Sequence, residues 1–147
     1  MLWNETYLTA FAGLWLVLAT WVVQWAIAAF YRASQPDHIP GKINPDLGHS
    51  SFAFRAHRVF MNSLENLPLM LGISFLAILV GVDPLWTAAL IWAYALARIG
   101  YSILYYALAT DRNPSPRSYL FLMGWLLQIT LLVLCLMMLW QYNMPAV

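Results

Sequence analysis

The sequence contains four apolar stretches, each close to the length of about 20 residues that an α-helix needs to cross the hydrocarbon core of a bilayer. Residues that favour turns separate these stretches, including the pair Asp83-Pro84 between the second and the third. We therefore expect one domain, residues 1–147, and an all-α fold class: a bundle of four transmembrane helices. The predicted spans cover about residues 7–31, 55–82, 85–108 and 118–142.

The composition agrees with a membrane protein. Apolar residues make up 63% of the chain and charged residues 9%, whereas soluble proteins carry roughly 25% charged residues. The net charge of +1, without a cluster of basic residues, argues against a nucleic-acid partner, because phosphates require a basic patch. The single cysteine, Cys135, excludes an intrachain disulfide, a CxxC redox pair and a cysteine-based zinc site.

The basic residues predict an orientation. All but Arg98 lie in or beside the first and third connections, so by the positive-inside rule these connections face the cytoplasm and both termini face outward, across the inner membrane in a bacterium. Trp3, Trp86 and Trp140 then fall at the outer ends of their spans, where amphipathic rings favour the headgroup level. No basic residue precedes the first span and no cleavage site follows it, so we expect an anchor and not a removed signal peptide.

Two polar stripes run along the predicted spans, with members three or four residues apart. At about 100° per residue, each stripe occupies one side of its helix. Because an ionisable side chain within a span must face the bundle interior, a cavity or a partner, we expect the two stripes to face something together. The stripes are Arg55, Arg58, Asn62 and Glu65 in the second span, and Tyr94, Arg98, Tyr101 and Tyr105 in the third.

Two interpretations of these stripes stay open. In the structural one, Glu65 pairs with Arg98 or Arg58, and the network fixes how the helices pack. In the functional one, the arginines outnumber the carboxylates near the cytoplasmic half, so a partly buried positive charge calls for an anionic ligand. Guanidinium forks and tyrosine hydroxyls suit a small molecule with carboxylates or a thiolate.

At the start of the fourth span, Arg117 and Ser118 fall within the first helical turn. Free backbone N–H groups and the helix dipole favour negative charge there and can depress the pKa of a bound thiol. The alternative is that Arg117 snorkels to the lipid headgroups while Ser118 caps the helix. The histidines, His38 and His49 in the first connection and His57 off the stripe, have no metal-binding spacing, so we expect no metal.

The second-span stripe belongs to the order Arg-x-x-Arg-x-x-x-Asn-x-x-Glu-Asn-x-Pro, from Arg55 to Pro68. With this order the chain resembles the MAPEG family, the membrane-associated proteins of eicosanoid and glutathione metabolism. The resemblance continues with Ala97-Arg98-x-x-Tyr101-x-x-x-Tyr105 and with Arg117-Ser118, covers essentially the whole chain, and is nearest to bacterial members.

The resemblance implies a homotrimer of four-helix bundles that binds glutathione, as a co-substrate, between neighbouring subunits near the cytoplasmic face. The first-span arginine of the family's eicosanoid synthases aligns near Ala26, and the nearest arginine here is Arg32. Either Arg32 reaches the site from a longer helix, or one carboxylate contact is missing. Arg117 would stabilise the thiolate, with Ser118 beside it. The expected glutathione-binding residues are Arg55, Arg58, Asn62 and Glu65 from the second span, and Arg98, Tyr101 and Tyr105 from the third span of a neighbour.

The resulting expectation is an integral membrane, glutathione-dependent transferase or peroxidase. Its second substrate would be a lipophilic electrophile or a lipid hydroperoxide that enters from the membrane lipids. One alternative is a noncatalytic lipid-binding or scaffold protein of the same fold. Another is a four-span transporter that uses Glu65 as a proton-coupled carboxylate, which the adjacent arginines disfavour because they keep that carboxylate ionised.

Overall fold

The computed structural model describes residues 3–36, 39, 41–112 and 114–143, without the side chains of Trp3, Asn4 and Asn143. The predicted positions of the Trp3 ring and of His38 therefore lie outside it. After the short helix α1 (Trp3–Thr6), the chain forms four long helices and, in the ranges described, no strand. All four are long and apolar enough to cross a membrane, which confirms the predicted four-helix all-α fold. They are α2 (Leu8–Ala33), α3 (Phe52–Leu79), α4 (Pro84–Ala107) and α5 (Pro116–Asn143).

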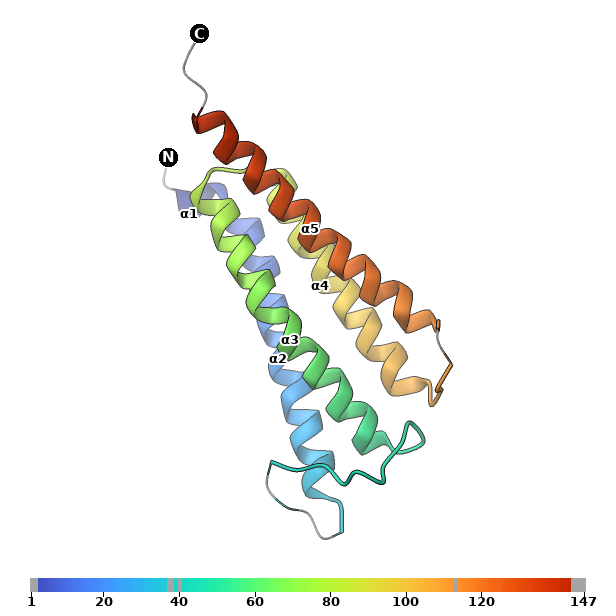
Figure 1. Ribbon diagram of the computed structural model, residues 1–147. Helices are drawn as coiled ribbons and strands as arrows, with labels where there is room; N and C mark the ends of the chain where they lie inside the picture. The colour runs from blue at the N-terminus through green and yellow to red at the C-terminus, as the bar shows by residue number, and fades with distance from the viewer. Residues whose placement is uncertain (1–2, 37–38, 40, 113, 144–147) are drawn as a thin grey trace.

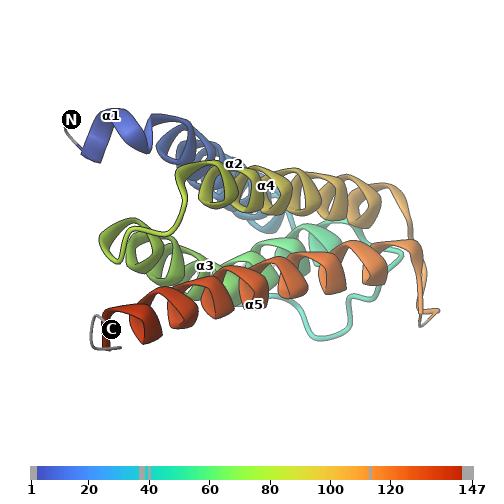
Figure 2. The same cartoon turned by 90° about the horizontal axis from the view of Figure 1, so that it is seen from above.

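The long helices alternate in direction (Figure 1). The α3–α4 connection lies at the same end of the bundle as the chain termini, whereas the α2–α3 and α4–α5 connections lie at the opposite end, which we call the long-loop end. Figure 2 shows α2 and α4 in one layer and α3 and α5 in the other. Helix α4 packs against α2, α3 and α5, so residues on several of its faces are buried.

Local sequence sets the tight connection between α3 and α4. Gly81 adopts a φ of 76°, a left-handed conformation that glycine reaches without steric cost. Its N–H donates to the carbonyl of Ile78, and the N–H of Val82 donates to the carbonyl of Ala77, which is a Schellman end to α3. Asp83 then accepts hydrogen bonds from the first backbone N–H groups of α4, so the two helices must lie antiparallel and side by side.

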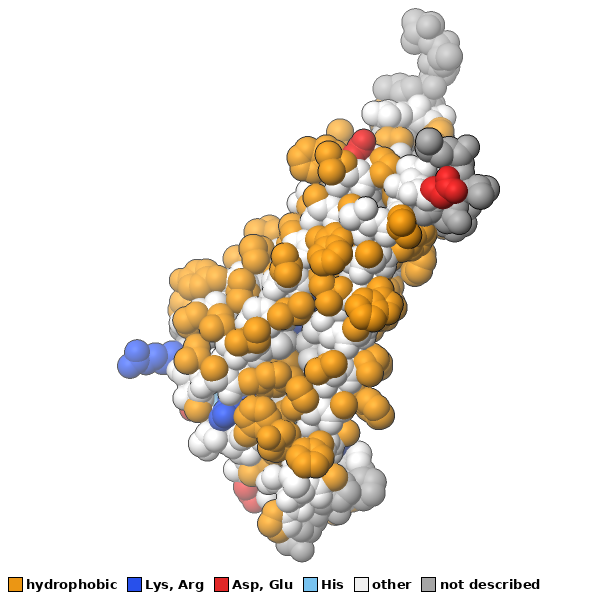
Figure 3. All heavy atoms as spheres, turned by 180° about the vertical axis from the view of Figure 1, so that it is seen from behind, with side chains coloured by type: hydrophobic (Ala, Val, Ile, Leu, Met, Phe, Trp, Pro, Cys, Tyr) orange, Lys and Arg blue, Asp and Glu red, His pale blue; other side chains and the backbone are white. Residues whose placement is uncertain are grey.

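The apolar core lies in the half of the bundle nearest the termini, where all four long helices contribute. Met70, Ile91 and Leu131 are fully buried there. At Gly13, α2 approaches α4 so closely that an added Cβ would lie 2.8 Å from the Ile91 Cγ2 atom. The outer surface is apolar as well: Figure 3 shows hydrophobic side chains covering most of one face, and Trp15 and Trp140 are among the exposed ones. This pattern suits a bundle surrounded by lipid.

The close approach at Gly13 predicts a stability difference. Gly13→Ala and Gly72→Ala both replace a helical glycine and gain the same helix propensity, but a Cβ at Gly72 meets nothing within 4 Å. We expect Gly13→Ala to be less stable than Gly72→Ala by about 1–3 kcal/mol, because buried Ile91 has no room to yield. Thermal unfolding of both variants in one detergent measures this. Equal midpoints would contradict the close packing of α2 on α4.

Candidate functional site

Three arginines are buried near the long-loop end, each on a different helix. Arg55 on α3, Arg98 on α4 and Arg117 on α5 expose only 9%, 5% and 8% of their surface. No described carboxylate lies within ion-pair distance of any of them. Since an isolated buried charge is unfavourable, the surroundings of each guanidinium determine what this region can bind.

Two of these cations lie on tyrosine rings. The Arg98 guanidinium carbon is 4.7 Å from the centroid of the Tyr101 ring, and that of Arg117 is 4.0 Å from the centroid of the Tyr105 ring. The two rings contact each other, with centroids 5.5 Å apart. Arg98, Tyr101 and Tyr105 of the predicted α4 stripe therefore form a column, the α4 column, that ends against Arg117 of α5, with the two rings between the two guanidinium groups. Such contacts contribute about 2 kcal/mol where water is excluded.

Arg117 turns into the bundle and does not snorkel outward. Its Nη2 atom donates to the carbonyl oxygen of Thr110 at 2.7 Å, and Nη1 donates to that of Leu108 at 3.4 Å. The Ser118 hydroxyl accepts a hydrogen bond from the backbone N–H of Ser115 at 3.2 Å, and so caps the start of α5. Of the two residues predicted to act on a thiolate, Arg117 thus faces the buried column, and Ser118 stays bound to its own helix start.

His49, in the α2–α3 connection, is a member of this cluster that the sequence did not indicate. Its Nε2 atom lies 3.2 Å from Nη2 of Arg117 and 3.3 Å from the Tyr105 hydroxyl oxygen. Its Nδ1 atom lies 3.4 Å from Oδ1 of Asp111 in the α4–α5 connection. A loop histidine has no periodicity that could relate it to residues 56 and 68 positions away. The structure alone brings it to the site.

Arg55 links the same connection to α4. Its Nη1 atom donates to the carbonyl oxygens of His49 and Ser50 at 2.5 and 3.0 Å, and its Nε atom donates to that of Tyr106 at 3.2 Å. The side chain predicted to bind a ligand therefore holds two backbone segments together. This geometry favours a structural role for Arg55.

The rest of the α3 stripe is partly or fully exposed. Arg58 and Glu65 are exposed, and within the described chain neither forms a hydrogen bond or an ion pair. Asn62 is half-buried, with a side-chain oxygen that has no partner among the described atoms. Arg98 donates to the Ser63 hydroxyl at 2.9 Å, so the structural interpretation, in which Glu65 pairs with Arg98 or Arg58, is not realised in the single chain. No hydrogen bond or ion pair joins the two stripes in the described part of the chain.

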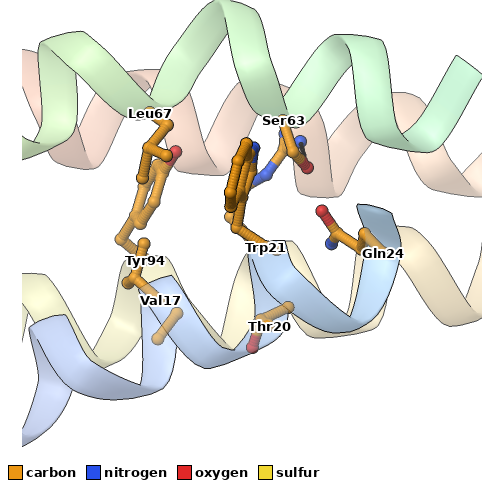
Figure 4. A pocket seen from close by; sticks show the side chains of 9 residues that line it. Val17, Thr20, Trp21, Gln24, Ser63, Leu67 and Tyr94 are labelled. Carbon is orange, nitrogen blue, oxygen red and sulfur yellow. Dashed lines mark hydrogen bonds between the residues drawn. The ribbon is translucent and has the colours of Figure 1, made fainter. Parts of the chain in front are cut away.

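A small cavity lies beside Arg98, in the middle of the bundle (Figure 4). Trp21 and Gln24 enter it from α2, opposite Ser63 on α3. Gln24 donates to the Ser102 hydroxyl at 2.8 Å, whereas its side-chain oxygen and the Trp21 ring N–H have no partner in the described chain. The volume of about 20 Å³ holds about one water, and ligand pockets need roughly 300 Å³ or more. The single chain thus encloses no ligand-sized pocket around Arg98.

A larger hollow of about 500 Å³ lies between the end of α2 and the α2–α3 connection. Arg32 and Lys42 line it together with mostly apolar side chains, and none of the predicted site residues does. In the described ranges, no group of three or more His, Cys, Asp or Glu side chains is placed to hold a metal ion. The chemistry available at the long-loop end is therefore that of arginine, tyrosine and one histidine.

The MAPEG family model matches residues 5–137, nearly the whole chain. The chain belongs to the MAPEG family. No curated protein and no solved structure matches it. With four apolar helices of spanning length, this MAPEG chain is an integral membrane protein. The matched range includes the α3 stripe, the α4 column and the start of α5, so these features lie inside the family domain.

The hydrogen bonds of Arg55 predict that this MAPEG protein needs it for stability. Arg55→Ala leaves three backbone carbonyls without their charged donor, and we expect a loss of about 1.5–3 kcal/mol. Arg58→Ala, one turn further along α3 on an exposed side chain, is the matched control and should unfold near the wild-type temperature. Thermal unfolding without added ligand measures both. A loss of the same size in the two variants would refute the structural role of Arg55.

Proposed function

We propose that this MAPEG protein is a glutathione-dependent transferase or peroxidase that acts on lipophilic electrophiles or lipid hydroperoxides in the membrane. The observation that carries the proposal is the buried pair Arg98 and Arg117, which has no carboxylate partner among the described residues. Aromatic faces reduce the cost of burying these charges but do not neutralise them. An anion that binds beside the two arginines would neutralise them.

Glutathione has the chemistry that these residues suit. A guanidinium carries five N–H donors; Arg117 uses Nη1 and Nη2 for protein partners, and Arg98 uses one donor, so both retain donors for a ligand. Arg117 also lies in the first turn of α5, where the helix dipole favours a thiolate. Arg58 and Arg98 are suited to the two carboxylates of the tripeptide, and Glu65 to its ammonium group.

The proposed assembly is a homotrimer with a site between neighbouring subunits. Arg58 and Glu65 lie exposed on a membrane-spanning helix, a position at which ionisable groups need a partner or a polar cavity. A neighbouring copy would supply that cover, with its own Arg98, Tyr101 and Tyr105 on the other side of the ligand. We also propose that the long-loop end faces the cytoplasm, in a bacterium across the inner membrane, because the basic residues gather there.

In the proposed reaction, Arg117 holds the thiolate while the lipophilic substrate arrives from the bilayer. The protein contributes orientation and charge stabilisation, and it forms no covalent intermediate of its own. The exposed apolar surface of α2 and α5 admits apolar substrates in general.

A noncatalytic lipid-binding or scaffold protein of the same fold is the second candidate. It is favoured by Gln24, the polar residue that α2 directs toward Arg98. Gln24 is neutral, whereas a cation at this position would strengthen an anion site. It is also favoured by the backbone carbonyls that already engage Arg55 and Arg117.

Thiolate formation tests the proposed chemistry. We expect the ultraviolet difference absorbance of the purified protein to rise and saturate with glutathione near neutral pH. In Arg117→Ala the signal should fall at least about 10-fold, because one charge-assisted contact is lost. Arg112→Ala removes an exposed arginine from the α4–α5 connection and serves as the control. An unchanged signal in Arg117→Ala would exclude that residue from the mechanism. No signal in the wild type, with the oligomer intact, would favour the scaffold.

The role of Glu65 is tested by removing its proposed contact from either side. Glu65→Gln should weaken glutathione binding about 10-fold by calorimetry. An analogue without the α-amino group should bind the wild type and Glu65→Gln equally, because the contact is absent in both cases. Asp46→Asn, at an exposed carboxylate of the α2–α3 connection, is the control. If Glu65→Gln weakens both ligands by the same factor, Glu65 does not hold the ammonium group.

A further inference from the structure

His49 occupies a position in which its hydrogen-bonding partners define its protonation. Its Nε2 atom lies 3.2 Å from Nη2 of Arg117, and a guanidinium can only donate hydrogen bonds. Nε2 must therefore carry the lone pair, and the ring proton of neutral His49 is on Nδ1. Nδ1 is the atom that faces Asp111, 3.4 Å from the carboxylate oxygen. A carboxylate behind one ring nitrogen and an accepting second nitrogen directed into a site is the arrangement of a general base.

We propose that His49 is the proton acceptor for the thiol that binds beside Arg117. This assignment rests on the proposed function, which provides the thiol of glutathione. In the step, the S–H bond breaks, the electron pair stays on sulfur, and the proton forms a bond to Nε2 of His49. The thiolate then lies beside Arg117, and the imidazolium lies beside Asp111. Each of the two charges has an opposite neighbour.

The groups around His49 leave it as the proton acceptor of the cluster. Arg117 and Tyr105 face its Nε2 atom from α5 and α4; a guanidinium has no lone pair to accept a proton, and a phenol oxygen is a much weaker base than an imidazole. Phe54 packs on the ring from α3, and Arg55 binds only the backbone carbonyl. Asp111 faces the other ring nitrogen, and its side chain is 90% exposed. Histidine, by contrast, exchanges a proton between pH 5 and 8.

The same surroundings give the proton an exit. The His49 side chain exposes 18% of its surface at the long-loop end, so an imidazolium there can pass its proton to water once the thiolate has been consumed. Protonation also places a cation against Arg117 at a distance of 3.2 Å, which weakens that contact. The guanidinium donors held by Nε2 are thereby released toward the thiolate. Proton transfer and the charging of the anion site are coupled through one side chain.

The test counts protons. In a weakly buffered solution with an indicator dye, glutathione is mixed with the purified full-length protein, and protons released are compared with thiolates formed by ultraviolet absorbance. We expect the wild type to release well below one proton per thiolate near neutral pH, because His49 takes up the proton. A yield of one proton per thiolate would overturn the assignment without any variant.

His49→Gln separates proton chemistry from structure. The glutamine amide can accept from Arg117 and donate toward Asp111, but it takes up no proton. We expect this variant to release about one proton per thiolate and to need a higher pH for half-maximal thiolate formation. His57→Gln removes a histidine of α3 that forms no hydrogen bond in the described chain, and it should behave as the wild type.

The outcomes distinguish the two proposals. Thiolate formation in the wild type, with the same proton yield in His49→Gln, would overturn the role of His49 and leave the proposed function standing. No saturating thiolate signal in the wild type would overturn the proposed function and this assignment with it. If His49→Gln fails to fold, the proton count on the wild type still decides whether His49 takes up the proton.

Discussion

The arrangement at the long-loop end depends on how guanidinium groups are buried without carboxylates. The guanidinium groups of Arg55 and Arg117 are stabilised at the C-terminal end of α4, where the helix leaves backbone carbonyls unpaired and its dipole is negative. Arg55 binds the carbonyl of Tyr106 in the last turn, and Arg117 binds those of Leu108 and Thr110 just beyond it. Because α4 ends at Ala107, the starts of α3 and α5 are held against it by charged donors.

The two halves of the bundle are therefore held together by different interactions. Toward the termini, close apolar packing holds the helices, as at Gly13 and Ile91. Toward the long loops, the contacts are hydrogen bonds and ring faces around cations, and they involve the irregular connections as well as the helices. A network of this kind is rearranged by the arrival of one charge, whereas a close-packed apolar core is not. Arg98 and Arg117, on which the proposed function rests, belong to this network.

Periodicity predicted much of this molecule and also explains what it could not predict. The four helices, their breaks and the column on α4 follow from apolar length, turn residues and a repeat of 3.6. Periodicity says which residues share a face, but not what that face meets. Arg55 and Arg58 belong to one stripe, yet the first is buried against α4 and the second is exposed. The stripe lies across the boundary between the interior and the surface of the bundle.

Two residues at the site escaped prediction for different reasons. His49 lies in a connection, where no repeat applies and only the fold determines its neighbours. Gln24 lies within a predicted span, where its polar side chain is itself a signal, but it belongs to neither polar stripe, so periodicity does not relate it to Arg98. Its hydrogen bond to Ser102 shows that a neutral polar residue in a span, like an ionisable one, needs a hydrogen-bonding partner.

Glu65 is an ionisable residue in a span that has no such partner in the described chain. It lies 13 residues into α3, or about 20 Å from the start of the helix at 1.5 Å per residue. Pro68, three residues on, has no N–H to offer the carbonyl of Leu64, and the Asn62 side-chain oxygen is unpaired in the described chain.

Near this level α3 carries acceptors without donors, the exposed Glu65 carboxylate and the buried Asn62 oxygen, while Arg98 and Arg117 keep spare donors on the inner side of the bundle. Polar groups removed from water are stable only when donors and acceptors are paired. In the proposed homotrimer, a ligand held against a neighbouring copy would offer an ammonium group to the acceptors and carboxylates to the donors. These unpaired groups are the physical reason for proposing a site between subunits.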